Sequence, residues 1–132
     1  METIRIALFT LVVAFVALLV TMQVLIRMRA RALTGKPLPP IPGVIGKRIA
    51  SSKRALVYFF SPQCAACRAI TPRVREIGKT NDSVFAIDVS QNLDVARALG
   101  VMATPSTVEV EDGRVVGFHV GMVPPEVFAR FA

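Results

Sequence analysis

The chain holds two cysteines, Cys64 and Cys67, which are the residues best suited to chemistry. Only two alanines separate them; the pair follows an apolar run, residues 55–60, and precedes a run with helical character that we expect to begin at Ala65. At such a strand-to-helix turn, free backbone N–H groups and the positive end of the helix dipole favour a thiolate. We therefore expect Cys64 to attack disulfides and Cys67 to resolve the mixed disulfide, with Arg68 adding positive charge that lowers the pKa of the thiol.

Three other interpretations of the cysteine pair stay open. A structural zinc site needs four ligands, and only His119 is left to join the two cysteines, so we expect no metal. Copper-carrying modules share the spacing but usually have a methionine where this chain has Pro62. The pair could also be a structural link or two buried small hydrophobes. Dithiol–disulfide exchange needs no cofactor beyond the cysteines themselves.

A long apolar segment lies near the N-terminus. Residues 6–26 carry no charge, and a helix of that length spans about 30 Å, the thickness of the hydrocarbon core of a bilayer. The alternative is a cleaved signal peptide, but the stretch is longer than the usual apolar region of such peptides and no small-residue cleavage site follows it. We interpret residues 1–31 as a transmembrane anchor with a basic flank, and the lipid bilayer as one partner.

Basic residues cluster directly after this segment, at Arg27, Arg29, Arg31 and Lys36. Residues 1–36 carry five basic side chains and one acidic side chain, so they account for much of the formal net charge of +7. Anionic lipid headgroups are sufficient partners for these arginines, and no nucleic-acid partner is predicted. The positive-inside rule predicts that the domain after the helix faces the cytoplasm.

Proline and glycine then mark a linker at residues 32–46. Four prolines fall between Pro37 and Pro42, a density that favours an extended polyproline II spacer. The alternative is a loop that packs on the surface of the domain. Residues 47–132 are left for a single folded domain.

The sequence of the domain predicts alternating strands and helices followed by a hairpin. We expect strands at residues 55–60 and 84–89, helices at 65–77 and 93–99, a hairpin of strands 107–111 and 114–120, and a last helix at 124–131. The hairpin rests on the Asp112-Gly113 turn. Pro72 lies inside the first of these helices, where it should produce a kink.

The order of these elements resembles the thioredoxin fold over about residues 50–132. The matches are the Cys-x-x-Cys after a buried strand, Pro72 eight residues past Cys64, Thr104-Pro105 before the hairpin, and the glycine at 121. The resemblance implies an α/β fold with a central mixed sheet flanked by helices, behind the transmembrane helix. It also implies that Ala103, Thr104 and a cis Pro105 line the groove that binds protein thiol or disulfide substrates.

Three features depart from the thioredoxin pattern. The chain has no tryptophan, Tyr58 stands in the place of the buried aspartate, and Val84 stands in the place of its lysine partner. The Ser-Pro-x-Cys-x-x-Cys form is more similar to membrane-tethered maturation proteins of the bacterial inner membrane, which implies a domain on the periplasmic side, opposite to the prediction from the arginines.

Two hypotheses follow. The first is a membrane-tethered thiol–disulfide oxidoreductase that acts on protein thiols, with an unknown redox partner. The second is a membrane-tethered binding or assembly module that keeps the fold without the redox chemistry.

Overall fold

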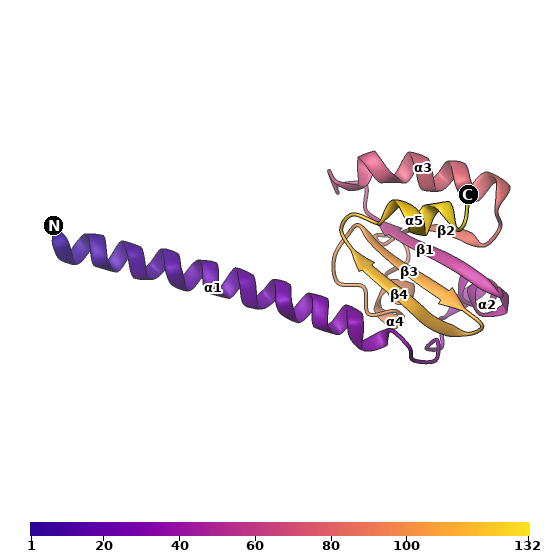
Figure 1. Cartoon of the computed structure of the whole chain (residues 1–132), viewed down its shortest axis with the longest axis horizontal. Coiled ribbons are helices and arrows are strands. Elements are labelled where there is room, and N and C mark those ends of the chain that lie inside the picture. The colour runs from indigo at the N-terminus through magenta and orange to yellow at the C-terminus, as the bar shows by residue number, and fades with distance from the viewer.

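The computed structural model describes residues 1–132, apart from the side chain of Ala30. It consists of a long N-terminal helix, α1 (Glu2–Leu33), that projects from an α/β domain (Figure 1). The domain contains, in chain order, α2 (Gly43–Ser51), β1 (Arg54–Phe60), α3 (Cys67–Thr80), β2 (Val84–Asp88), α4 (Leu93–Ala98), β3 (Ser106–Glu111), β4 (Arg114–Val120) and α5 (Pro125–Ala129).

The four strands form one mixed sheet in the order β2-β1-β3-β4. β1 pairs with β2 in parallel and with β3 in antiparallel fashion, and β3 and β4 form the hairpin. From Ala55 to Phe60 every residue of β1 is buried, because this central strand is covered on both faces. The predicted fold class, the order of the elements and the hairpin are confirmed.

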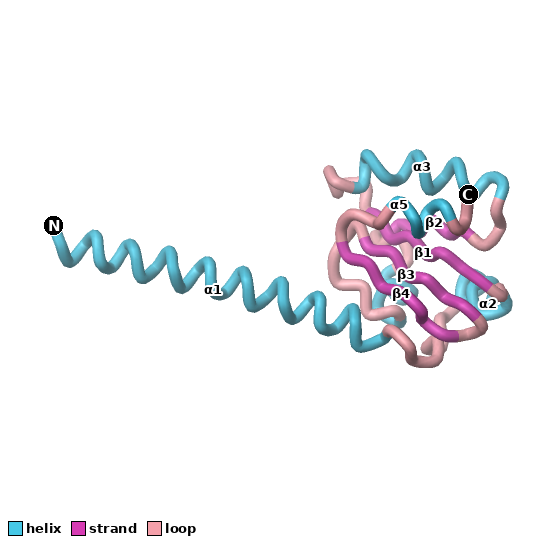
Figure 2. The backbone as a smooth tube through the Cα atoms, viewed as in Figure 1, coloured by secondary structure: helices cyan, strands magenta, loops and turns pink.

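Each face of the sheet packs against its own pair of helices (Figure 2). Alternate side chains of β1 point to opposite faces. Val57 and Phe59 pack with α2 and α4, whereas Leu56, Tyr58 and Phe60 pack with α3 and α5. The second face carries the cysteines, since Cys67 belongs to its core.

The helix α1 is long and apolar enough to cross a membrane. Its most apolar window has a mean hydropathy of 2.6, and none of that window is buried against the rest of the protein. The side chains of this part are almost all exposed, which in water would be unfavourable for so many large hydrophobic groups. Length and composition thus agree with the predicted anchor.

The proline-rich segment after α1 is not an extended spacer, and that prediction is wrong in this structure. It lies along the outer edge of β4: the N–H of Gly35 donates to the carbonyl of Val115 (2.6 Å), and the N–H of Leu38 donates to the carbonyl of Gly113 (2.8 Å). Ile41 packs on the domain core beside Leu38. Unpaired groups at a strand edge attract a partner strand, so this segment adopts the alternative, a loop packed on the domain.

Candidate active site

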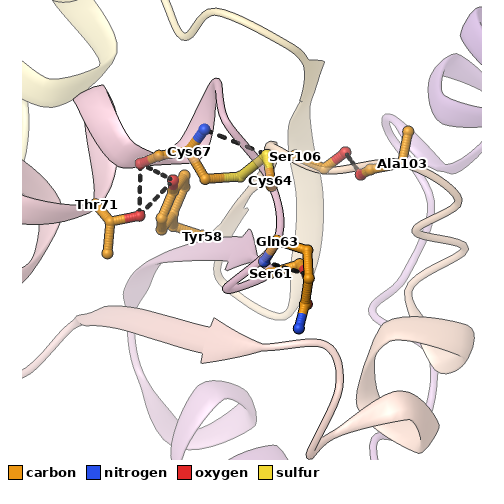
Figure 3. The surroundings of a disulfide bond; sticks show 8 residues. All are labelled: Tyr58, Ser61, Gln63, Cys64, Cys67, Thr71, Ala103 and Ser106. Atoms are coloured by element: carbon orange, nitrogen blue, oxygen red, sulfur yellow. Dashed lines mark hydrogen bonds between the residues drawn. A yellow bond between two sulfur atoms is a disulfide. The ribbon is translucent and has the colours of Figure 1, made fainter.

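Cys64 and Cys67 form a disulfide at the end of β1 (Figure 3). The chain leaves β1 at Phe60, turns through residues 61–66, and enters α3 at Cys67, so the helix begins two residues later than the sequence predicts. Cys64 is half-buried, whereas Cys67 is 2% exposed. The sulfur that an incoming substrate can reach is therefore that of Cys64.

The backbone at the start of α3 is directed at this outer sulfur. The N–H of Cys67 lies 3.2 Å from the Sγ of Cys64 and donates to it. The first N–H groups of a helix have no partner within the helix, and they stabilise negative charge. The same donor is in place to stabilise the thiolate of Cys64 once the disulfide is reduced, which is the effect that the sequence predicts for this position.

The turn before the cysteines is held by its own hydrogen bonds. The N–H of Cys64 donates to the carbonyl of Ser61 (3.1 Å), and the hydroxyl of Ser61 donates to the side-chain oxygen of Gln63 (2.8 Å). The N–H of Gln63 in turn donates to the Oγ of Ser61 (3.3 Å). These bonds fix the direction in which Cys64 is presented.

Beneath the pair, Tyr58 takes the position that the thioredoxin pattern gives to aspartate. Its side chain is fully buried, and its hydroxyl lies 3.0 Å from the Oγ1 of Thr71. Thr71 donates to the carbonyl of Cys67 (2.7 Å), as threonine in a helix commonly does to the residue four positions earlier. A neutral chain of hydroxyl groups therefore links β1 to the backbone of the inner cysteine. Thr71 was not among the predicted site residues, although its spacing of four from Cys67 is a usable signal.

Burial raises the pKa of Tyr58 above its ordinary value of 10.0, and the hydrogen bond with Thr71 and the charge of Arg75 oppose this shift. A raised pKa in the folded state means that the stabilisation is complete below pH 10 or so and is lost as the pH rises through the folded pKa. We expect the free energy of unfolding of the wild type to fall with pH in that range more steeply than that of Tyr58→Phe. Urea unfolding of both forms from pH 8 to pH 11 measures this difference, and parallel curves would contradict it.

The predicted substrate loop lies beside the disulfide. The Thr104–Pro105 peptide bond is cis, and the carbonyl of Pro105 accepts a hydrogen bond from the N–H of Gly121 (2.8 Å). The hydroxyl of Ser106 donates to the carbonyl of Ala103 (2.6 Å), and Figure 3 shows this pair next to Cys64. The structure thus brings Ala103, Thr104 and Pro105 to the same end of the sheet as the cysteines.

A hollow of about 630 Å³ extends from the disulfide along α3. Both cysteines line it, together with the cations Arg68, Arg75 and Lys79 and the carboxylates Glu76 and Asp88. Arg68 is exposed on the first turn of α3, in place to attract negative charge towards the sulfur of Cys64.

His119 lies outside this site. Its Nε2 is 2.8 Å from the Oε1 of Glu109, a buried carboxylate that also accepts from Arg130. Gly117 makes the room for this carboxylate, since a Cβ at that position would lie 2.6 Å from its Oε1. His119 is thus part of a polar cluster on the hairpin, as its strand position indicates, and not a group that faces the cysteines.

A disulfide of Cys-x-x-Cys spacing, placed between a buried central strand and a helix and flanked by a cis-proline loop, defines a redox-active domain of the thiol–disulfide oxidoreductase class. The family model described as Thioredoxin matches residues 46–132, and the chain belongs to the thioredoxin family.

Two curated relatives and two solved structures illustrate the similarity. Thioredoxin H7 of Arabidopsis thaliana is 37% identical over 82 residues, which are 61% of this chain and 64% of that protein, somewhat less than two thirds of its length. Thioredoxin of Bacillus subtilis (strain 168) is 34% identical over 74 residues, covering 54% of this chain and 71% of that protein. Thioredoxin of Fasciola hepatica superposes with a TM-score of 0.53 at 28% identity over 67% of this chain and 85% of that one. Malassezia sympodialis thioredoxin (Mala s 13), with a TM-score of 0.55 at 23% identity over 66% and 79%, shares the fold.

Proposed function

We propose that this protein is a membrane-tethered thiol–disulfide oxidoreductase of a bacterial inner membrane that exchanges disulfides with protein thiols. The observation that carries the proposal is the asymmetry of the pair: Cys64 faces the hollow and accepts a hydrogen bond from the N–H of Cys67, while Cys67 is buried behind it. An accessible sulfur that is stabilised as a thiolate, next to a protected resolving sulfur, is the arrangement that exchange requires.

The exchange balances without any other reactant. In the reduced protein the thiolate of Cys64 attacks one sulfur of a substrate disulfide, forms a mixed disulfide and releases the other sulfur as a thiolate. Cys67 then loses its proton and attacks the sulfur of Cys64, which releases the second substrate thiol. The protein ends as the disulfide seen here, and two electrons have passed to the substrate. The same steps in reverse oxidise a substrate dithiol.

Three residues are proposed to dock the substrate. Figure 3 shows Ala103 and Ser106 near the disulfide, and Thr104 and the cis Pro105 lie between these two in the chain. An extended substrate segment could pair there with backbone groups of the loop. The carbonyl of Ala103 already accepts a hydrogen bond from Ser106, so we propose the backbone groups of Thr104 as the main partners of a substrate. Arg68 is proposed to lower the pKa of Cys64 through its charge.

The tether is proposed to be α1. Its exposed apolar surface suits lipid, and the arginines that follow Ile26 suit the anionic headgroups at its end. The similarity of the Ser-Pro-x-Cys-x-x-Cys form to tethered maturation proteins supports the bacterial inner membrane as the location.

The second candidate, a tethered binding module without redox chemistry, is favoured by Tyr58, since no carboxylate lies at that position to relay a proton to Cys67. A full chain with Cys64→Ala and Cys67→Ala, reconstituted in nanodiscs, separates the two. We expect its rate with a fluorescent disulfide-linked peptide to fall to the uncatalysed level, with Val44→Ala, an exposed change on α2, as the unaffected control. A wild type that is no faster than the double variant would favour the binding module.

A further inference from the structure

The end of α1 and the redox site share one end of the domain. Leu33, the last residue of α1, packs on the domain core, and its Cδ1 lies only 3.1 Å from where a Cβ on Gly100 would be. Four residues earlier, Arg29 lies 3.6 Å from the sulfur of Met102 and donates to it. Met102 belongs to the same short loop as Ala103 and Thr104, so the anchor touches the loop that flanks the disulfide.

This arrangement leaves no hinge between anchor and domain. The residues after α1 are hydrogen-bonded to β4 almost at once, by Gly35 to Val115 and by Val115 to Lys36. A flexible linker would let the active site face any direction relative to α1. A connection of only two or three residues between packed elements fixes that direction instead. The direction of α1 therefore sets the direction of the active site.

The arginines give the depth at which this end of the domain lies. The apolar segment ends at Ile26, so the following arginines reach the headgroups of a bilayer that α1 spans. Because Arg29 contacts Met102, the loop beside the disulfide lies at headgroup depth as well. In Figure 1 the turn before α3 lies on the side of the domain that faces the N-terminal end of α1. The cysteines thus face the membrane surface.

The surface around this end fits an interfacial partner. Met102 is 57% exposed, Met122 is 77% exposed, and Val120 is 37% exposed. Met122 and Val120 line a second hollow together with Arg27 and Arg31 of α1. Flexible apolar side chains can pack against the apolar residues of a partner segment that leaves the bilayer. The neighbouring cations suit the lipid phosphates or the carboxylates that lie next to such a segment.

We propose that the substrate of this site is a membrane protein whose reacting cysteine lies at headgroup depth, within the layer that the tethered domain faces. The proposal rests on the proposed exchange function and on α1 crossing the bilayer; it concerns depth, so it holds for either side of the membrane. A folded soluble protein would have to enter between the domain and the bilayer to reach Cys64, and the fixed anchor leaves little room for that approach.

The orientation is tested without any redox reaction. The chain contains no tryptophan, so a single one is a unique fluorophore. We compare full-length Met102→Trp with Val44→Trp, a control on α2 at the opposite end of the domain (Figure 1), in vesicles whose lipids carry bromine near the headgroup. Quenching of Met102→Trp but not of Val44→Trp is expected. Equal quenching of both, or quenching of neither, would overturn the orientation.

The substrate class is tested with two membrane probes. Both are transmembrane peptides with one activated disulfide, placed either at the headgroups or about 30 Å above them on a helical extension of about 20 residues. We expect the wild type in proteoliposomes to react about tenfold faster with the low probe, because the two probes differ only in the effective concentration of the disulfide at the site. Equal rates, or a faster reaction with the raised probe, would overturn the proposal.

A variant with about 20 flexible residues inserted between Arg27 and Met28 completes the design, since such an insert has a mean span of about 25 Å and leaves Leu33 on the domain. It should react with both probes at similar rates and lose the quenching when combined with Met102→Trp. If this variant kept the preference of the wild type, the fixed anchor would not be its cause. If neither protein reacted with either probe, the exchange function itself would fail, while the quenching result would still report the orientation.

Discussion

Replacing Cys64 with serine is expected to lower the rate of disulfide exchange by about 1,000-fold or more, because a serine hydroxyl is not ionised at neutral pH and cannot replace a thiolate as nucleophile. The remaining thiol, Cys67, is 2% exposed and cannot take over the attack. The measurement is the single-turnover rate of the full chain in nanodiscs with a fluorescent peptide disulfide.

The matched variant is Cys67→Ser, which removes the same kind of atom one helical turn further on. This variant keeps the attacking sulfur and the N–H that donates to it, so the first step should proceed and the mixed disulfide should accumulate. A non-reducing gel shows that adduct directly. The assignment of roles would be reversed if Cys64→Ser formed the adduct and Cys67→Ser did not, and equal adduct formation by both would remove the asymmetry on which the proposed function rests.

The second large effect is expected at Tyr58. Tyr58→Ala should lower the free energy of unfolding by about 3–5 kcal/mol, because the side chain fills the core between β1 and α3 completely and its loss leaves a cavity. Tyr58→Phe keeps the ring and loses the hydroxyl, with its hydrogen bond to Thr71 (3.0 Å) and its longer one to the carbonyl of Cys67 (3.5 Å), which should cost about 1 kcal/mol. Urea unfolding of the oxidised full chain, followed by far-ultraviolet circular dichroism because Tyr58 is the only tyrosine and no tryptophan is present, gives both values.

The same two variants report the role of the hydroxyl. If Tyr58 acts by packing, Tyr58→Phe should exchange disulfides within a few-fold of the wild type, since Thr71 still holds the carbonyl of Cys67. A loss of stability in Tyr58→Phe as large as in Tyr58→Ala would instead show that the hydrogen bond dominates.

Much of the domain could be predicted because its signals are local. The apolar run at 55–60 and the Asp112-Gly113 turn each depend on a few neighbouring residues, and the strand and hairpin they indicate are present. The place of Pro105 near the cysteines was not a local signal: it was implied by the resemblance to the thioredoxin pattern, and the Thr104–Pro105 peptide bond is cis.

The features that escaped prediction depend on contacts between distant parts of the chain. The composition of residues 37–42 favours an extended spacer. The neighbouring backbone instead forms hydrogen bonds with the open edge of β4, which is far away in sequence. The sequence predicts that α3 starts at Ala65, but the two alanines form a turn in which the N–H of Arg68 donates to the carbonyl of Ala65 (3.2 Å), and α3 begins only at Cys67. The role of the Thr71 hydroxyl depends on its hydrogen bond with Tyr58, which lies on a different element.

The pairing of the segment after α1 with β4 has a practical consequence for any soluble form of the protein. With β4 at the end of the sheet, Gly35 and Leu38 donate to the carbonyls of Val115 and Gly113, and the carbonyl of Lys36 accepts from the N–H of Val115. These backbone groups would otherwise be free to recruit a strand from another molecule. A truncation that removes the anchor together with these residues would leave that edge open to self-association. The shortest well-behaved domain should therefore begin no later than Thr34, although the thioredoxin family match begins only at residue 46.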